Sequence, residues 1–195
     1  SPLSSIQGSL YFLAELTHDD PDSPAGQALN ISIRSANKLM NLVNSLLDIA
    51  RLSTGQTLVE LQAQRLESTL DAAVGYLLPL AVDGEIDLVK QVEPDLPLGL
   101  IVEDKIYRVL VNFIDNALKF TPRGGQITVC AERWASDAGH AMVRCMVRDT
   151  GPGIPPEYRM RIFDRFVQIA NRSGRRRGTG IGLNFCQLAV NAHGG

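Results

Sequence analysis

The sequence has few cysteines. Its three, Cys130, Cys145 and Cys186, are odd in number and widely spaced, so we expect neither a disulfide framework nor a zinc site. This cysteine usage is typical of a reducing compartment. We therefore expect a cytoplasmic location for this chain, while the sequence leaves open whether the parent protein is anchored in a membrane.

Long hydrophobic runs and an excess of charge of one sign are also lacking. The apolar, uncharged run at residues 72–82 contains Pro79 and is too short to span a bilayer, and no signal peptide is found. The 19 Lys and Arg against 21 Asp and Glu give a net charge of -2, which predicts no general affinity for nucleic acid or a membrane surface. The chain starts without Met and stops at Gly195, so we interpret it as a fragment of a longer protein.

What the sequence does contain begins with a helical hairpin. Leu3, Ile6, Leu10 and Leu13 form one apolar stripe, a polar loop follows, and Ser23 is expected to cap a second helix that runs to about Arg51. Heptad spacing then joins Leu29, Ile33, Ala36, Met40, Val43, Leu47 and Ala50. A second stripe, Leu39, Leu42, Leu46 and Ile49, lies beside the first. Two stripes need more than one partner, which a four-helix bundle of two chains supplies; packing on the rest of the chain is the alternative.

Beyond a linker at residues 52–57, short strands alternate with helices. We expect strands at residues 58–61, 86–92, 126–132 and 141–148, and helices at residues 66–80, from a cap at Asp104 to about residue 120, and at 181–192. This order predicts an α+β fold, in which helices cover one face of an antiparallel or mixed sheet in an α/β sandwich.

The helix after Asp104 carries polar side chains on a second face. Ile106, Leu110, Phe113 and Ala117 form its apolar face, and Asn112, Asn116 and Lys119 stand at i, i+4 and i+7. A carboxamide oxygen suits Mg²⁺ and a lysine suits phosphate, so this face suggests a nucleotide site. The alternative is that the asparagines face water or cap neighbouring backbone.

Two glycine clusters follow. Asp149-Thr-Gly-Pro-Gly153 comes after an apolar strand, and Gly178-Thr-Gly-Ile-Gly-Leu183 opens a helix. Glycine lets backbone approach a ligand closely, and amides at a helix start attract anions. Each cluster alone is also typical of a turn.

The order of these motifs along the chain resembles the order found in a known protein family. The Asn-x-x-x-Asn helix, Asp-x-Gly-x-Gly, Phe163-Asp-Arg-Phe166 and Gly-x-Gly-x-Gly resemble the N, G1, F and G2 boxes of sensor histidine kinases, within the superfamily of gyrase, Hsp90 and MutL. The first two helices resemble the family's dimerisation domain, whose phosphoacceptor motif is His-Glu-x-x-Thr-Pro-Leu. Ser1-Pro2-Leu3 matches only its end, so the acceptor histidine would lie four residues before Ser1. The resemblance implies a dimerisation and phosphotransfer domain at residues 1–53 and an ATP-binding domain, truncated at its C-terminus, at 54–195.

The resemblance also implies roles for individual residues. Asn112 and Asn116 would bind Mg²⁺, with Asn112, Lys119 and Arg165 in catalytic positions near the phosphates. Asp149 would read the adenine amino group, and the nucleotide would further contact Asn116, Lys119, Gly151, Gly153, Gly178, Thr179, Gly180, Gly182 and Leu183. The stretch between Phe166 and Gly178 resembles the family's ATP lid, and we assign no catalytic role to its arginines, Arg172, Arg175, Arg176 and Arg177. Phe163 and Phe166 would anchor this lid, and Gln168 replaces an arginine found in many members.

The implied activity is autophosphorylation in a two-component system. A homodimer would transfer the γ-phosphoryl group of ATP to a histidine, and then to an aspartate of a response-regulator receiver domain. No nucleic acid and no membrane contact of this fragment are expected. The alternatives are a nucleotide-binding dimerisation module without catalysis, or another ATPase of the same superfamily.

Overall fold

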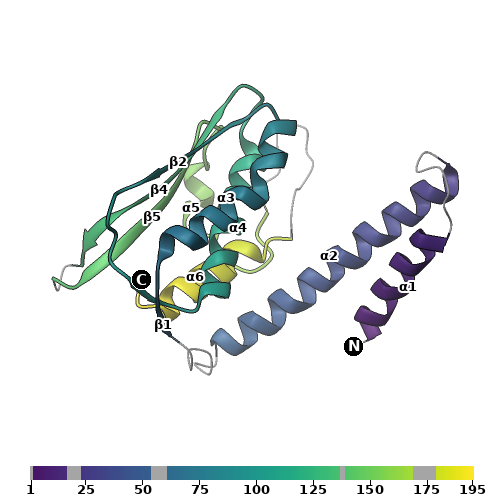
Figure 1. Cartoon of the computed structure of the whole chain (residues 1–195), viewed down its shortest axis with the longest axis horizontal. Coiled ribbons are helices and arrows are strands. Elements are labelled where there is room, and N and C mark those ends of the chain that lie inside the picture. The colour runs from purple at the N-terminus through teal and green to yellow at the C-terminus, as the bar shows by residue number, and fades with distance from the viewer. Residues whose placement is uncertain (1, 17–22, 54–60, 137–138, 169–178) are drawn as a thin grey trace. The chain divides into compact units, whose positions relative to one another are not determined.

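The computed structural model describes residues 2–16, 23–53, 61–136, 139–168 and 179–195. Within these residues the chain forms two compact units, residues 1–50 and 51–195 (Figure 1). No helix of the described ranges is long and apolar enough to cross a bilayer. Residues 58–60 of the strand predicted at 58–61, and residues 169–177 of the predicted ATP lid at 167–177, lie outside these ranges.

The N-terminal unit is the predicted hairpin of α1 (Pro2–Leu16) and α2 (Pro24–Ser53). The Ser23 hydroxyl accepts the N–H of Gly26 at 3.0 Å, as expected of an N-cap. The Gln7 amide donates to Asn37 Oδ1 at 2.7 Å, and Asn37 in turn donates to the Tyr11 hydroxyl at 3.1 Å, which ties the two helices together. Helix α2 continues two residues beyond the predicted end at Arg51.

The second unit contains a mixed three-stranded sheet, as predicted. Its order is β2 (Asp87–Val92), β4 (Gln126–Ala135) and β5 (Ala141–Asp149), with β2 parallel and β5 antiparallel to β4. A separate two-stranded sheet pairs β1 (Gln62–Gln64) with β3 (Gly99–Ile101). The predicted strand at 58–61 is wrong at Leu61, which precedes β1, and β3 was not predicted.

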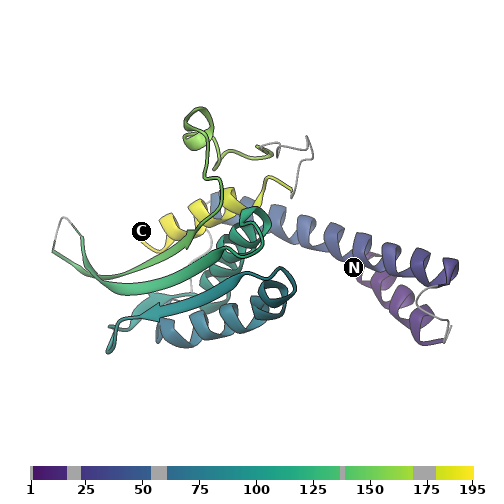
Figure 2. The same ribbon diagram turned by 90° about the horizontal axis from the view of Figure 1, so that it is seen from above.

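Helices cover one face of the three-stranded sheet (Figure 2). They are α3 (Leu66–Asp83), α4 (Glu103–Phe120) and α6 (Gly182–Ala192), and a short α5 (Pro156–Arg159) follows β5. Alternate residues of β4, namely Ile127, Val129 and Ala131, are buried in one core with apolar residues of α3 and α4. Helix α6 packs on α4, where Cys186 Sγ lies 3.8 Å from the Val109 carbonyl oxygen.

The start of α4 differs from the prediction. The helix begins at Glu103, one residue before the expected cap, and its N-cap Val102 has no side-chain hydrogen bond. Asp104 instead lies in the first turn beside Glu103, where two carboxylates interact favourably with the positive end of the helix dipole. The face that carries Asn112 and Asn116 is unaffected by this shift.

Candidate functional site

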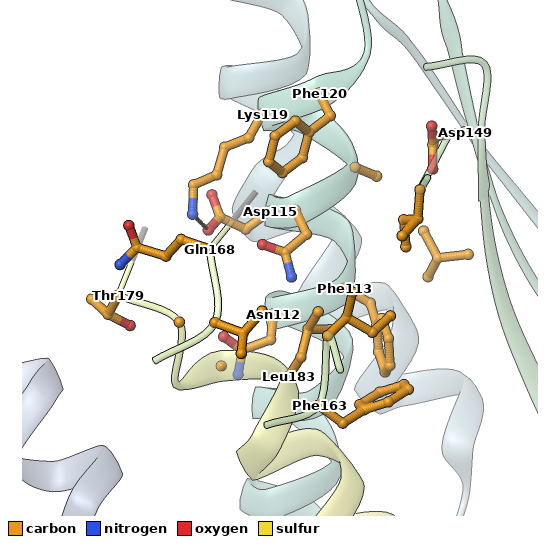
Figure 3. Close-up of a pocket in the computed structure, with 18 of the residues that line it drawn as sticks. Asn112, Phe113, Asp115, Lys119, Phe120, Asp149, Phe163, Gln168, Thr179 and Leu183 are labelled. Atoms are coloured by element: carbon orange, nitrogen blue, oxygen red, sulfur yellow. Dashed lines mark hydrogen bonds and ion pairs between the residues drawn. The ribbon is translucent and has the colours of Figure 1, made fainter. Parts of the chain in front are cut away.

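A cavity of about 360 Å³ opens where α4, the end of β5, the segment around Phe163 and the start of α6 meet (Figure 3). Nine residues of the predicted site line it: Asn112, Asn116, Lys119, Asp149, Gly153, Thr179, Gly180, Gly182 and Leu183. The remainder of the described wall is Phe113, Asp115, Ala117, Phe120, Val147, Ile154, Ile162, Phe163, Val167 and Gln168. A cavity of this volume, with apolar walls and a few polar groups, is typical of a small-molecule site.

Three predicted site residues are not part of this wall. Gly178 lies outside the described residues, and Arg165 is not among the lining residues although Phe163 and Gln168 are. Gly151 contributes through its backbone, because its N–H donates to Asp149 Oδ1 at 2.8 Å. A Cβ atom at Gly151 would lie 2.6 Å from that oxygen, so glycine is needed there to keep the carboxylate in place.

Helix α4 contributes the polar wall. Asn112, Asp115, Asn116 and Lys119 occupy one face because their spacings of three and four match the helical repeat. Asn112 Nδ2 donates to the Arg108 carbonyl oxygen at 2.9 Å, which orients Oδ1 of the same amide toward the start of α6. The sequence prediction missed Asp115, although its spacing from Asn112 and Lys119 places it on this face.

Asp115 and Lys119 form an ion pair across one turn of the helix. Their side chains are 37% and 33% exposed, so the pair is only partly shielded from water. Figure 3 shows both side chains on the same side of α4 as Gln168 and Thr179. This part of the cavity therefore holds a cation, a carboxylate and neutral amides close together.

Asp149 lies at the other side of the drawn residues, at the C-terminal end of β5 (Figure 3). Apolar Val147, Phe120 and Ile154 line the same cavity. A carboxylate beside apolar side chains can accept a hydrogen bond from a flat ring that those side chains cover. The neighbouring Thr150 does not line the cavity, and its hydroxyl accepts the Gln126 N–H at 2.9 Å.

The start of α6 closes the cavity against α4. Gly180 has φ +70°, and its carbonyl oxygen accepts the Phe166 N–H at 2.7 Å. Gly182 is the first residue of α6, where a Cβ atom would lie 2.8 Å from Asn112 Oδ1. Glycine at this position lets the start of α6 come close to the Asn112 amide, and the N–H groups at a helix start attract anions.

The segment around Phe163 is held to α6 by a side chain. Asn184 Nδ2 donates to the Phe163 carbonyl oxygen at 2.9 Å, and the Phe163 side chain lines the cavity. Phe166 is 63% exposed and has a φ of +65°, while most of the lid that we expect it to anchor lies outside the described residues. The lid arginines, residues 172 and 175–177, lie outside the described part of the chain.

The donor atoms fit a magnesium ion that is shared with a polyphosphate. Among the described residues no group of three or more His, Cys, Asp or Glu could hold a metal ion alone. Mg²⁺ usually takes one or two protein oxygens and completes its shell with water and phosphate oxygens. The Asn112 carbonyl oxygen, fixed by the Arg108 contact and facing the start of α6, is a donor of this kind.

Comparisons with known proteins agree with this geometry. A family described as "Histidine kinase-, DNA gyrase B-, and HSP90-like ATPase" matches residues 101–195, and one described as "His Kinase A (phospho-acceptor) domain" matches residues 1–55. The chain belongs to the sensor histidine kinases. Both motif sets on which the resemblance rested, the helical pair and the boxes of the ATPase part, thus lie within matched ranges.

Individual histidine kinases resemble the chain along its whole length. The signal transduction histidine-protein kinase BarA of Escherichia coli K12 is 34% identical over all of this chain and 21% of its own length. The hybrid signal transduction histidine kinase D of Dictyostelium discoideum is also 34% identical, over all of this chain and 12% of its own. The crystal structure of full-length ShkA in complex with AMPPNP is 30% identical with a TM-score of 0.79, covering 99% of this chain and 38% of that one. The chain thus spans a minor part of these relatives.

Proposed function

We propose that this chain is the kinase core of an ATP-dependent protein histidine autokinase of a two-component system. Residues 1–53 would form the dimerisation and phosphotransfer domain and residues 54–195 the ATP-binding domain. The observation that carries the proposal is the single cavity lined by Asn112, Lys119, Asp149 and the glycines of the α6 start, which are far apart in the sequence. Such a cavity offers separate places for a base and for phosphates.

Each end of the cavity would bind a different part of ATP. Gly151 fixes one oxygen of the Asp149 carboxylate, and the other oxygen would accept a hydrogen bond from the adenine amino group. Gly153 would allow the chain to pass close to the base. At the far end Lys119 would bind phosphate oxygens, and Gly180, Gly182 and Leu183 would donate backbone N–H groups to them, with a hydroxyl from Thr179 and with Gly178 beside them.

Mg²⁺, when bound, would neutralise charge on the phosphates of ATP. Asn112 Oδ1 is the donor best placed to hold it, with Asn116 one turn further along the same face of α4. Arg165 would act on the terminal phosphate after a movement of its segment, since it does not line the cavity in this structure. The side chains of α4 thereby position groups and stabilise spread negative charge, which is the protein's main contribution to phosphoryl transfer.

The partners would be a second copy of the chain and a receiver domain. Helices α1 and α2 leave large apolar side chains exposed, among them Ile6, Phe12, Leu39, Leu46 and Leu47. A four-helix bundle with a second chain would bury such residues, and a response-regulator receiver would dock on that bundle. These reactions would take place in the cytoplasm.

The test uses a chain extended upstream to include the histidine that the family motif places before Ser1. With Mg²⁺ and ATP labelled at the γ-phosphate, the extended chain should become labelled, and should pass the label to an aspartate of its cognate receiver domain. Asn112→Ala should abolish labelling and Mg²⁺-dependent nucleotide binding while the dimer stays intact, as measured by light scattering. Unchanged nucleotide affinity of this variant would remove Asn112 from the site.

A module that binds nucleotide without transferring phosphate is the second candidate. It is favoured by Gln168, a neutral side chain that lines the cavity where many family members carry an arginine. In the labelling experiment this module would bind nucleotide normally but incorporate no label. Gln168→Arg would then be the variant to test for restored labelling.

A further inference from the structure

The described wall of the cavity does not carry a net positive charge. Its charged lining residues are Asp115, Lys119 and Asp149, two carboxylates against one ammonium. A nucleotide polyphosphate is strongly anionic, so its binding to this wall depends on how the positive charge of Lys119 is shared between the phosphates and Asp115. No role for Asp115 was predicted from its motif.

The Lys119 ammonium already has an acidic partner in the absence of phosphate. It is paired with the Asp115 carboxylate, and the acidic residue stands four positions before the basic one, the more favourable orientation on a helix. A phosphate that binds Lys119 must compete with this carboxylate. The phosphate then lies within a few ångströms of an Asp115 side chain whose charge is no longer neutralised by the ion pair.

The position of Asp115 on α4 links it to the predicted metal donors. It lies between Asn112 and Asn116 on the same helix face, and all three line the cavity. A divalent cation held by these amide oxygens would add positive charge to the part of the cavity that Asp115 lines. Bound cation would therefore offset the repulsion that free nucleotide experiences.

We propose that Asp115 makes the site selective for nucleotide that carries a divalent cation over free nucleotide. The proposal rests on the nucleotide site proposed above and names a residue that sets its metal dependence. Asp115 acts through charge and through its hold on Lys119, and is a specificity-determining residue rather than a group that reacts.

The experiment is titration calorimetry of the 195-residue chain with AMPPNP, once with Mg²⁺ and once with EDTA, at low ionic strength so that screening is small. The quantity compared is the dissociation constant measured in EDTA divided by the dissociation constant measured in Mg²⁺. Asp115→Asn should lower this ratio about tenfold, mainly by tightening binding without metal, as expected when one partly screened unit charge is removed near the phosphates. Asp115→Glu keeps the charge and should leave the ratio within about twofold.

The matched control is Asp104→Asn, which removes the same charge from the same helix. Asp104 lies in the first turn of α4, is 79% exposed and does not line the cavity, so the ratio should not change. An unchanged ratio in Asp115→Asn would refute the proposal. So would a ratio lowered only by weaker binding of the Mg²⁺ form, because Asp115 would then be a metal ligand or a positioning partner of Lys119. Failure of the unmodified chain to bind AMPPNP with Mg²⁺ would instead refute the proposed function itself. Melting curves identify any variant that fails to fold.

Discussion

Gly182→Ala tests the contact between α6 and α4 on which the polyphosphate end of the cavity depends. The added Cβ atom would lie 2.8 Å from Asn112 Oδ1 and 3.4 Å from its Cγ, whereas ordinary contacts begin at 3.4 Å. Either the amide or the start of α6 must move by about half an ångström. Both groups are proposed to contact the metal and the phosphates, so the movement separates donors that must act together.

The expected cost falls on binding more than on stability. Misplaced donors should weaken AMPPNP binding in Mg²⁺ by about tenfold or more, which is about 1.4 kcal/mol. Overpacking costs about 1 to 3 kcal/mol, but the clash is with the end of a side chain that can move, so the free energy of unfolding should fall by only about 1 kcal/mol. Titration calorimetry and urea denaturation measure the two quantities.

Gly75→Ala is the matched control. Gly75 lies inside α3, and apart from the adjacent residues and the backbone of its own helix no atom lies within 4 Å of the position its Cβ would take. This variant should be more stable by about 0.5 to 1 kcal/mol and should bind nucleotide normally. Gly182→Ala with unchanged affinity would contradict the close approach of α6 to Asn112, and with it the proposed phosphate end of the site.

Three further predictions follow from the same structure. Asp149→Asn should reduce the preference for adenosine over inosine nucleotides about tenfold in competition binding, because one carboxylate acceptor is lost; an unchanged preference would remove Asp149 from base recognition. Burial raises the pKa of the Cys186 thiol from 9.0 to about 12, so this thiol ionises in the unfolded chain at a lower pH than in the folded chain. The free energy of unfolding should therefore fall between about pH 9 and 12, and Cys186→Ala should reduce this fall in denaturant titrations. Equal pH slopes in both proteins would contradict the prediction. Leu70→Ala, at a fully buried position of α3, should cost about 2 to 5 kcal/mol in urea denaturation, and a cost below about 1 kcal/mol would contradict the packing of this core.

The sequence predicted the long elements well, because their periodicity is strong. The alternation of β4 and the helical spacing of α3 and α4 reflect burial on one face, and the structure contains all three with ends shifted by a few residues. Strands β1 and β3 have three residues each, too few for an alternation to be recognised, and their pairing joins Gln62 to Ile101 across a long stretch of sequence. Pairing of this kind depends on tertiary packing and leaves no local pattern.

The site was predictable as a set of residues but not as a set of contacts. Asn112, Lys119 and Asp149 stand in motifs whose order is specific, and the structure places them around one cavity. Asp115 was missed because an acidic residue four positions before a lysine also occurs on any solvated helix face. The approach of Gly182 to Asn112 and the exposure of Phe166 depend on how distant segments pack, which a single sequence does not encode locally.

The most direct test is a crystal structure of the chain grown with AMPPNP and Mg²⁺. Adenine hydrogen-bonded to Asp149, with the metal ion on Asn112 and the phosphates at the start of α6, is the predicted arrangement. Nucleotide bound away from the α4–α6 cavity, or bound there with its base at Asn112 and its phosphates at Asp149, would contradict the account.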